Sequence, residues 1–320
     1  MPLSNSVYYL GIDGGGSRTT AWVGDDRKRT LARATGGPGN PVKVGIDCAL
    51  RNILEAAHIA QRKARLRGQE FEAICAGIAG AGRPSSDRLL LSKLRSGLRA
   101  RRYILTTDGL IALECALGQS AGVIVISGTG SIAYGRGPDR QVLRCGGWGS
   151  VFDDAGSGYE IARRAVAAAL RAIDGRGRPT RLGVTLCRAL RITHITQVAG
   201  MALRPDEIAA LFPSVLRAAR AGDPEAKRII HEAGIALAEM AAAILCRMSK
   251  PGNSPRVVCA GGVFRSSLAV RRSFAAHLGQ SGAHAKVELL RREPVEGALS
   301  LARAADGDLG LVNGGPTCQR

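Results

Sequence analysis

Two stretches of the chain repeat one pattern: an apolar strand, a glycine-rich turn and a second apolar strand. The first spans residues 7–24 (VYYLGI, DGGGSR, TTAWVG), and the second spans residues 121–137 (AGVIVIS, GTGS, IAYGRG). The segments after both turns are rich in β-branched and aromatic residues, which favours strands and makes each pattern a hairpin. A repeat at this separation predicts two related halves, each opening with a hairpin, and a ligand cleft between them.

The chemistry of the first turn favours phosphate binding. A Walker A loop requires a lysine, and a dinucleotide loop leads into a helix, but DGGGSR has no lysine and leads into a strand. Its glycines permit positive φ and present backbone N–H groups to an anion, while Ser17, Arg18 and Thr19 add donors. Asp13 would repel phosphate alone, so we expect it to hold Mg²⁺ or its waters. One such turn can be a plain hairpin without a ligand, but two such turns in one chain favour phosphate binding over that interpretation.

Strand-like and helical segments alternate along the remaining sequence, which predicts an α/β protein.

The eight cysteines are dispersed without metal-ligand spacing, which argues against a zinc or iron–sulfur site. The formal net charge of +19 comes mostly from dispersed arginines, without aromatic interleaving, so anionic ligands such as nucleotides are favoured over nucleic acid. No apolar run reaches the roughly 18 residues of a membrane span, and no signal peptide precedes the first strand. The sequence therefore predicts a cytoplasmic protein.

Five motifs in register carry a family resemblance: IDGGGSRTT, TTDG, ISGTGS, GGWG with a Gly/Ser-rich turn, and AGGVF. Together they resemble the ATP-binding motifs of the sugar kinase, actin and Hsp70 superfamily. Within it, residues 8–303 resemble the BadF/BadG/BcrA/BcrD ATPase family, whose members include N-acetylglucosamine and glucosamine kinases. The resemblance implies two actin-like (ribonuclease H-like) lobes, with mixed sheets flanked by helices and a central ATP cleft. The N-terminal lobe would cover residues 1–118, with about 293–320 packing back on it, and the C-terminal lobe residues 119–292.

The resemblance also implies roles for particular residues. In that family the two hairpins cradle the β- and γ-phosphates of ATP, and a later Gly-Gly turn lies against the adenosine. The matching positions are Gly14, Gly15, Gly16, Ser17, Arg18, Thr19, Gly128, Thr129, Gly130, Ser131, Gly261, Gly262 and Ser266.

Asp108 follows a strand in LTTDG, where its carboxylate can accept a proton from an attacking hydroxyl. Aspartates at strand ends are also common turn or cap residues. In the sugar kinases that the chain resembles, this Asp is the catalytic base. The expected substrate-binding positions are Asn40, Gly80, Asp108, Thr129, Gly146, Gly147 and Asp154, while Trp148 either stacks on a sugar or packs the loop.

One loop departs from the family pattern. GGWGSVFDDAGSG places Asp154 on the family's sugar-binding Asp, but Asp153 replaces a Gly and Ala155 replaces a Glu. This departure affects the identity of the substrate more than the fold or the ATP chemistry.

Three functions follow from the sequence. The first is an ATP- and Mg²⁺-dependent kinase of a hexosamine such as N-acetylglucosamine or glucosamine, with Asp108 as base and a homodimer as the expected assembly. The second is an ATPase that drives a partner protein, and the third is a sugar-binding regulator without catalysis. The dispersed cysteines disfavour the second because the family's activators bridge an iron–sulfur cluster, and the intact Asp13, Asp108 and hairpins disfavour the third.

Overall fold

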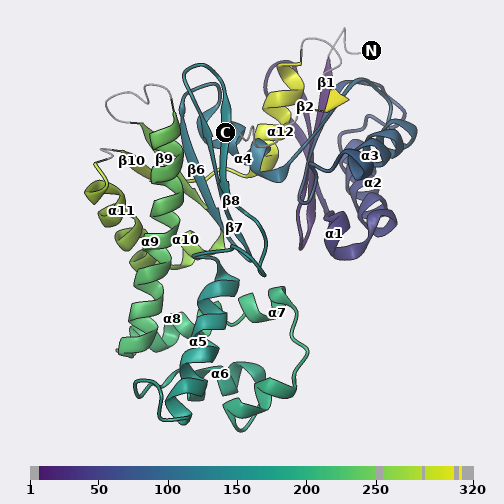
Figure 1. Ribbon diagram of the computed structural model, residues 1–320. Helices are drawn as coiled ribbons and strands as arrows, with labels where there is room; N and C mark the ends of the chain where they lie inside the picture. Colours follow the sequence, from purple (N-terminus) through teal and green to yellow (C-terminus); the bar gives the residue numbers. More distant parts are fainter. Residues whose placement is uncertain (1–6, 249–254, 283–284, 306–309, 312–320) are drawn as a thin grey trace. The chain divides into compact units, whose positions relative to one another are not determined.

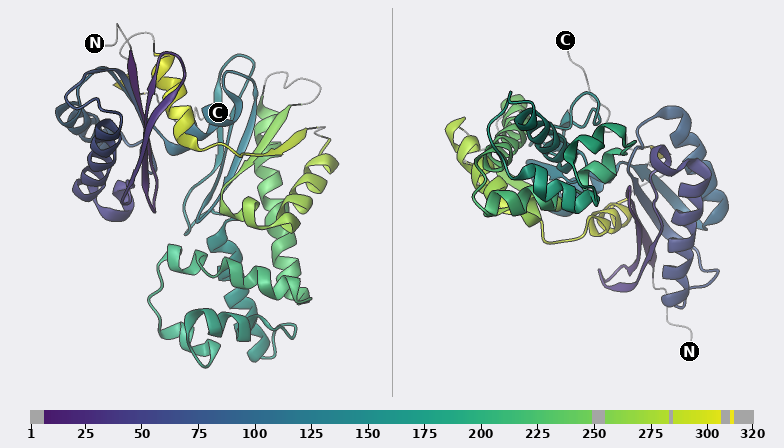
Figure 2. Two further views of the ribbon diagram at one scale, coloured as in Figure 1. Left: turned by 180° about the vertical axis from the view of Figure 1, so that it is seen from behind. Right: turned by 90° about the horizontal axis from the view of Figure 1, so that it is seen from below.

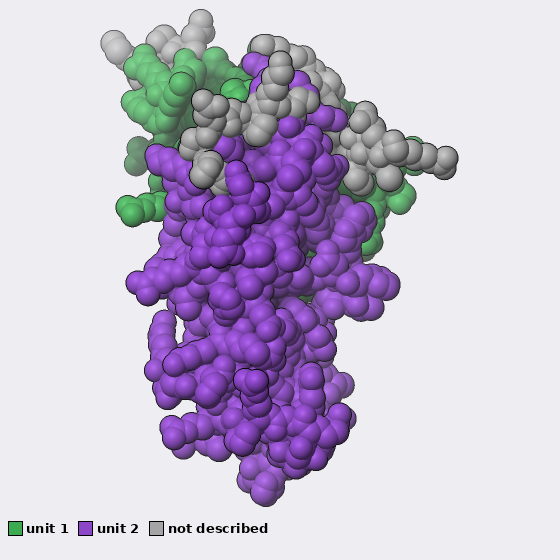
Figure 3. Space-filling view, turned by 60° about the vertical axis from the view of Figure 1, so that its left-hand side comes forward, with its two compact units in different colours: residues 1–120, 291–320 green, residues 121–290 purple. Residues whose placement is uncertain are grey.

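The computed structural model describes residues 7–248, 255–282, 285–305 and 310–311. The chain divides into two compact units, Met1–Ser120 with Arg291–Arg320 as unit 1 and Ala121–Leu290 as unit 2 (Figure 3). The sequence analysis placed the lobe boundaries after residues 118 and 292. Each unit is described separately below.

Unit 1 contains a sheet in the order β11-β5-β4-β1-β2-β3. β1, β2 and β3 pair antiparallel, whereas β4, β5 and β11 continue from β1 in parallel. Its elements are β1 (Tyr8–Gly14), β2 (Thr19–Asp25), β3 (Thr30–Gly36), α1 (Pro41–Val44), α2 (Ile46–Lys63), β4 (Phe71–Ile78), α3 (Pro84–Gly97), β5 (Ala100–Thr106), α4 (Asp108–Leu117), α12 (Pro294–Arg303) and β11 (Gly310–Leu311).

Helices cover both faces of this sheet (Figure 2). Ile74, Ala76 and Ile78 of β4 pack with buried residues of α2 and α3, while the alternate residues Ala73 and Cys75 pack with α4 and α12. This alternation follows from the two-residue side-chain period of a strand. The return of α12 to unit 1 was predicted from the sequence. The part of that prediction beyond Ala305, apart from β11, lies outside the described residues.

Unit 2 has a five-stranded sheet in the order β10-β9-β6-β7-β8. β6, β7 and β8 pair antiparallel, and β9 and β10 continue in parallel from β6, as β4 and β5 do from β1. Its elements are β6 (Gly122–Ser127), β7 (Ser131–Arg136), β8 (Val142–Gly146), α5 (Gly158–Ile173), α6 (Leu182–Leu190), the 3₁₀ helix η1 (Ile195–Gly200), α7 (Pro205–Ala209), α8 (Phe212–Arg220), α9 (Pro224–Arg247), β9 (Arg256–Ala260), α10 (Gly262–Ser266), α11 (Leu268–Gln280) and β10 (Lys286–Leu289).

The two sheets therefore share one topology around their opening hairpins, which is the relation that the repeated sequence pattern predicts. The α/β class is confirmed, with mixed sheets flanked by helices (Figure 1). The sequence analysis did not assign β8, the third strand of the unit 2 meander, because its residues VLRCG mix a charged side chain with a glycine.

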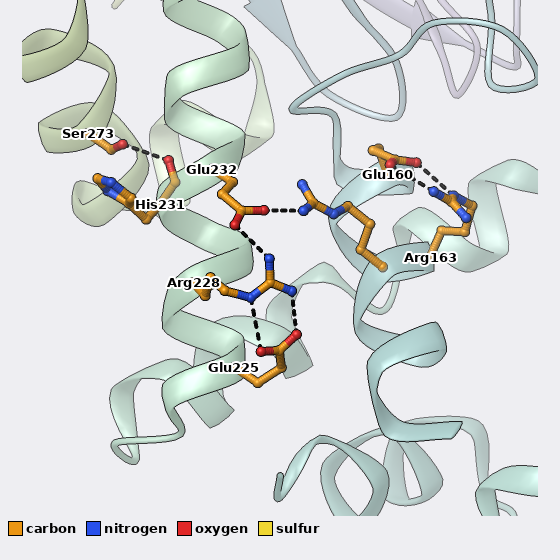
Figure 4. A network of polar contacts seen from close by, with 8 residues as sticks. Glu160, Arg163, Glu225, Arg228, His231, Glu232 and Ser273 are labelled. Carbon is orange, nitrogen blue, oxygen red and sulfur yellow. Dashed lines mark hydrogen bonds and ion pairs between the residues drawn. The ribbon is translucent and has the colours of Figure 1, made fainter. Parts of the chain in front are cut away.

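The long helix α9 forms the centre of unit 2 and packs beside α11 (Figure 1). Among helices of the described residues, it is the only one long and apolar enough for a membrane span, and more than half of that window is buried inside the protein. Its polar side carries Glu225, Arg228 and Glu232, which are linked by ion pairs, and Glu232 also contacts Arg164 of α5 (Figure 4). Burial on one side and a charge network on the other are typical of a core helix.

Candidate active site

In unit 1, four of the predicted site residues lie where parallel strands end. Asp13 and Gly14 close β1, Gly80 follows β4, and Asp108 follows β5 at the start of α4. Because parallel strands present their carboxyl ends at one edge of a sheet, these residues gather at the same edge. Thr107 caps α4, since its hydroxyl accepts the Leu110 N–H at 3.2 Å, and this fixes the start of the helix that carries Asp108.

The first hairpin turn offers free backbone donors. The Gly15 N–H donates to the Arg18 carbonyl at 3.0 Å, but the N–H groups of Gly16 and Ser17 have no partner among the described residues. A Cβ on Gly16 would meet only the flexible Lys43 side chain, at 3.9 Å, so the turn is open there. Free, accessible N–H groups are the requirement for an anion nest.

The glycines of this turn permit positive φ, but none of them adopts it. The positive-φ glycines of the chain do not include Gly14, Gly15 or Gly16. Close approach explains Gly14 instead, because a Cβ there would lie 2.6 Å from the Ile78 side chain. The loop after β3 also packs closely against Gly14, since a Cβ on Gly39 would lie 2.8 Å from the Gly14 Cα.

The loop that carries Asn40 is tied to this turn. The Gly39 N–H donates to the Gly15 carbonyl at 2.9 Å, and the Thr19 hydroxyl donates to the Gly37 carbonyl at 2.8 Å. Thr19 is fully buried, so its hydroxyl serves this internal bond. Asn40 caps α1 by accepting the Val42 N–H at 2.9 Å, which leaves its amide NH₂ without a partner among the described residues.

Gly80 lies against the Asn40 side chain, since a Cβ on Gly80 would sit 3.0 Å from the Asn40 Oδ1. The loop after Gly80 is held by Asp87, whose carboxylate accepts the Gly82 N–H at 2.9 Å. Asp87 is buried and was not predicted as a site residue. Its position in PSSD, in the first turn of α3, is the sequence signal for an acidic residue that accepts backbone N–H groups. The structure thus brings Asn40, Gly80 and the first turn together within unit 1.

Both Asp13 and Asp108 have raised pKa values, and the charge of Asp108 acts on Asp13. Burial raises the pKa of Asp13 to about 7, and the negative charges of Asp108 and Glu293 add to the rise, while Arg18 opposes it. Desolvation also raises the pKa of Asp108, and a hydrogen bond from the Gly109 N–H opposes that rise. Paired acids with raised pKa values are typical of sites that receive a cation or move a proton.

In unit 2, the second hairpin turn repeats this arrangement. The Gly128 N–H donates to the Gly130 carbonyl at 2.9 Å, while the N–H groups of Thr129 and Gly130 have no partner among the described residues. As in the first turn, Gly128 and Gly130 are not among the positive-φ glycines. The Gly128 carbonyl accepts the Gly158 N–H at 2.8 Å, so the N-terminus of α5 adjoins the turn. A helix N-terminus adds favourable potential for an anion.

Asp154 lies on this turn. Its carboxylate accepts the Ser131 N–H at 3.3 Å, and a Cβ on Gly130 would be 3.0 Å from its Oδ1. Burial raises the pKa of Asp154, the Ser131 bond opposes this, and the charges of Asp153 and Glu160 add to the rise. The buried Ser131 hydroxyl donates to the Ala155 carbonyl at 2.7 Å and therefore joins the loop to the turn.

Gly146 and Gly147 both have positive φ, 70° and 73°, where a side chain would be strained. The sequence analysis missed the residue that supports them, Arg144 of β8. Its guanidinium donates to the Gly147 carbonyl at 2.6 Å and stacks on the ring of Trp148 at 4.6 Å. Trp148 is 59% exposed, so one face of its ring remains available.

The Gly261–Gly262 turn adjoins the same region of unit 2. Gly261 has φ of 97°, and a Cβ there would lie 2.1 Å from the Ser127 carbonyl oxygen, so only glycine fits. Ser127 in turn donates its hydroxyl to the Gly156 carbonyl at 2.9 Å. These contacts join the end of β6 to the loop with Asp154 and to the turn with Gly261. Ser266 lies exposed at the end of α10.

Metal binding in unit 1 would depend on a ligand as well as on protein. Within the described residues, no group of three His, Cys, Asp or Glu side chains is arranged to hold a metal ion. Mg²⁺ commonly takes one or two carboxylates and completes its shell with phosphate oxygens and waters. Asp13 lies beside the first hairpin turn with its free N–H groups, and a single carboxylate in that position fits this mode of Mg²⁺ binding.

Comparison with known proteins agrees with this geometry. The model of the BadF/BadG/BcrA/BcrD ATPase family matches residues 10–301. The N-acetylmuramic acid/N-acetylglucosamine kinase of Clostridium acetobutylicum is 32% identical over 93% of this chain and 98% of its own. The N-acetyl-D-glucosamine kinase of Dictyostelium discoideum is 29% identical over 81% of this chain and 86% of its own.

A solved structure is similar at the level of the whole chain. It is a candidate N-acetylglucosamine kinase from Chromobacterium violaceum, with a TM-score of 0.77 and 28% identity, over 92% of this chain and 99% of that one. The family model alone covers most of the sequence, including every turn and strand end described above. The chain belongs to the BadF/BadG/BcrA/BcrD ATPase family.

Proposed function

We propose that this protein is an ATP-dependent hexosamine kinase that phosphorylates N-acetylglucosamine or glucosamine. The observation that carries the proposal is the pair of hairpin turns with free N–H groups, one in each unit, together with the carboxylates of Asp13 and Asp108. Relatives that match most of the chain are named as kinases of amino sugars, which supports the same substrate class.

Each group has a role in phosphoryl transfer. Asp108 accepts the proton of the sugar hydroxyl as that oxygen attacks the γ-phosphate of ATP. The N–H groups of Gly16, Ser17, Thr129 and Gly130 donate to phosphate oxygens and stabilise the charge that develops during transfer. The amide of Asn40 and the carboxylate of Asp154 bind sugar hydroxyls, and Gly80, Gly146 and Gly147 let the loops approach the sugar closely. Gly261 and Gly262 border the adenosine.

Asp13 holds Mg²⁺ through water in this proposal. When bound, Mg²⁺ neutralises phosphate charge and lowers the pKa of nearby carboxylic acids. A base must be ionised, and this positive charge favours the ionised form of Asp108. We further propose that the protein works in the cytoplasm and that it forms a homodimer. Light scattering on the purified protein tests the oligomeric state.

The decisive experiment measures ADP release over a panel of hexoses and hexosamines with ATP and Mg²⁺. We expect turnover with N-acetylglucosamine or glucosamine, and loss of at least about 10³-fold in kcat for Asp108→Asn with ATP affinity nearly unchanged, because only the proton acceptor is removed. Asp26→Asn, at an exposed carboxylate of the same unit, is the matched control. Equal ADP release with and without sugar would favour a partner-driving ATPase, and sugar binding without turnover would favour a regulator.

A further inference from the structure

Unit 1 contains a cavity of about 640 Å³ at the ends of α2 and α3. Helices α2 and α3 lie side by side (Figure 1). The short helix α1, which Asn40 caps, leads into α2, and α3 follows the loop that contains Gly82. The cavity lies at their other ends, and α2 alone, at 18 residues, is about 27 Å long. The lining residues are His58, Gln61, Arg62, Arg67, Gly68, Gln69, Gly97, Leu98 and Arg99.

The lining residues include three exposed arginines and no acidic residue. Arg62, Arg67 and Arg99 make no ion pair among the described residues, and the adjacent Glu70 pairs with Arg101 instead. The C-termini of α2 and α3 each contribute a partial charge of about −0.5, which offsets about one of the three positive charges. The remaining charge of about +2 matches a phosphate monoester, which carries about −1.5 to −2 at pH 7.

The loop between α2 and β4 is built to hold this arrangement. The buried Gln61 side chain donates to the Gln69 carbonyl at 3.1 Å, and the Leu66 N–H donates to the Gln61 carbonyl at 3.0 Å. The Arg99 carbonyl accepts the Phe71 N–H at 3.0 Å, so the segments with Arg67 and Arg99 are anchored to the same framework. The backbone that carries the arginines is therefore held in place by hydrogen bonds, and less conformational entropy is lost when a ligand binds.

The cavity is larger than an oxyanion needs. A volume of about 640 Å³ falls within the range of small-molecule sites, and a bare phosphate would occupy a small part of it. His58 and Gln69 add polar side chains to the lining beyond the arginines, which suits a ligand with hydroxyl groups.

We propose that this cavity binds the phosphate monoester of a small polar metabolite, at a site separate from the proposed active site. The guanidinium groups of Arg62, Arg67 and Arg99 hold the phosphate, since arginine donates two parallel N–H bonds to such groups. The polar remainder of the cavity holds the organic part. A sugar phosphate and a nucleoside monophosphate share this chemistry, and the test separates them.

The test is calorimetric titration of the full chain with glucosamine 6-phosphate, N-acetylglucosamine 6-phosphate, AMP and inorganic phosphate, without Mg²⁺. We expect at least one monoester to bind at least tenfold more tightly than inorganic phosphate. Arg67→Ala/Arg99→Ala should weaken that binding at least tenfold and leave ATP affinity unchanged. Arg88→Ala, at an exposed arginine of α3 outside the lining, is the matched control.

Hydrogen exchange of the wild-type protein gives a second measure that needs no variant. The bound monoester should slow exchange in residues 58–69 and 97–99. The proposal is overturned if no monoester binds, if inorganic phosphate binds equally well, if the double variant binds normally, or if protection occurs only around residues 13–19 and 128–131. Tight binding of a short RNA in place of every monoester would also overturn it. None of these outcomes depends on kinase activity, so the proposed function can fail separately.

Discussion

Replacing Asp13 by asparagine is expected to stabilise the ligand-free protein at pH 8. The folded state raises the pKa of Asp13 to about 7, whereas an unfolded chain has about 3.9. Below about pH 4 both states hold the proton, and Asp13 makes no contribution. Between pH 4 and 7 the folded state keeps a proton that the unfolded state has lost, so stability falls as pH rises, and above 7 the loss is constant.

The size of this effect follows from the shift. One unit of pKa corresponds to 1.36 kcal/mol, so a difference of about 3 units gives an upper bound of about 4 kcal/mol. Asparagine has a similar shape without the charge and escapes this cost. We therefore expect Asp13→Asn to exceed the wild type in free energy of unfolding by about 2 to 4 kcal/mol at pH 8 and by less than about 1 kcal/mol at pH 4.5.

Urea unfolding at pH 4.5, 6 and 8, with a chelator present, measures these differences. The chain has two tryptophans: Trp22 of β2 is 3% exposed, whereas Trp148 is 59% exposed. A Trp148→Phe background therefore makes the fluorescence report on unit 1 alone. Asp26→Asn serves as control, because its side chain is exposed in the same unit. A difference between Asp13→Asn and wild type that does not change with pH would refute the electrostatic argument, as would a less stable variant at pH 8.

Three further predictions concern other parts of the chain. Asp223 is desolvated, but its hydrogen bonds with the Ala226 and Arg181 N–H groups and the Thr180 hydroxyl lower its pKa. Asp223→Ala should cost about 2 to 3 kcal/mol in urea unfolding at pH 7, and the difference should shrink as pH falls below about 4, because a depressed pKa stabilises only above the unfolded value. Gly297→Ala should lower the unfolding free energy by about 3 kcal/mol or more, since its Cβ would lie 1.9 Å from the Ile111 carbonyl oxygen; an unchanged thermal midpoint would contradict the packing of α12 on α4. Arg144→Ala should raise the KM for sugar about tenfold with the KM for ATP unchanged, and Arg144→Lys should not restore it, because lysine cannot both stack on Trp148 and donate to Gly147 in one plane.

The sequence predicted the elements that depend on local pattern. The hairpins follow from β-branched residues on both sides of a glycine turn, and Asp13 and Asp108 fall at strand ends because the apolar runs stop there. The similar topology of the two units follows from the repeat of this pattern. These features require only side-chain period and turn chemistry.

Contacts between distant loops could not be predicted in the same way. Nothing near Thr19 in the sequence indicates that its hydroxyl donates to Gly37, and the position of Asp87 in the first turn of α3 does not indicate that the Gly82 N–H is the group it accepts. Arg144 was missed because its role depends on the register of β8, which places its side chain under Trp148. Such contacts arise only when the sheet has brought the loops together, so they depend on tertiary packing rather than on local pattern.

The discontinuous make-up of unit 1 has a consequence for its synthesis. Cys75, Ile104 and Ile111 pack with Ala298 and Ala302 of α12, which leaves the ribosome only after all of unit 2 has been made. At 5 to 20 residues per second, this interval is roughly 10 to 40 seconds. Unit 2 is contiguous in sequence and can close its own sheet during that time. An apolar face of the nascent unit 1 therefore stays uncovered throughout this interval, when chaperone binding or aggregation competes with the arrival of α12.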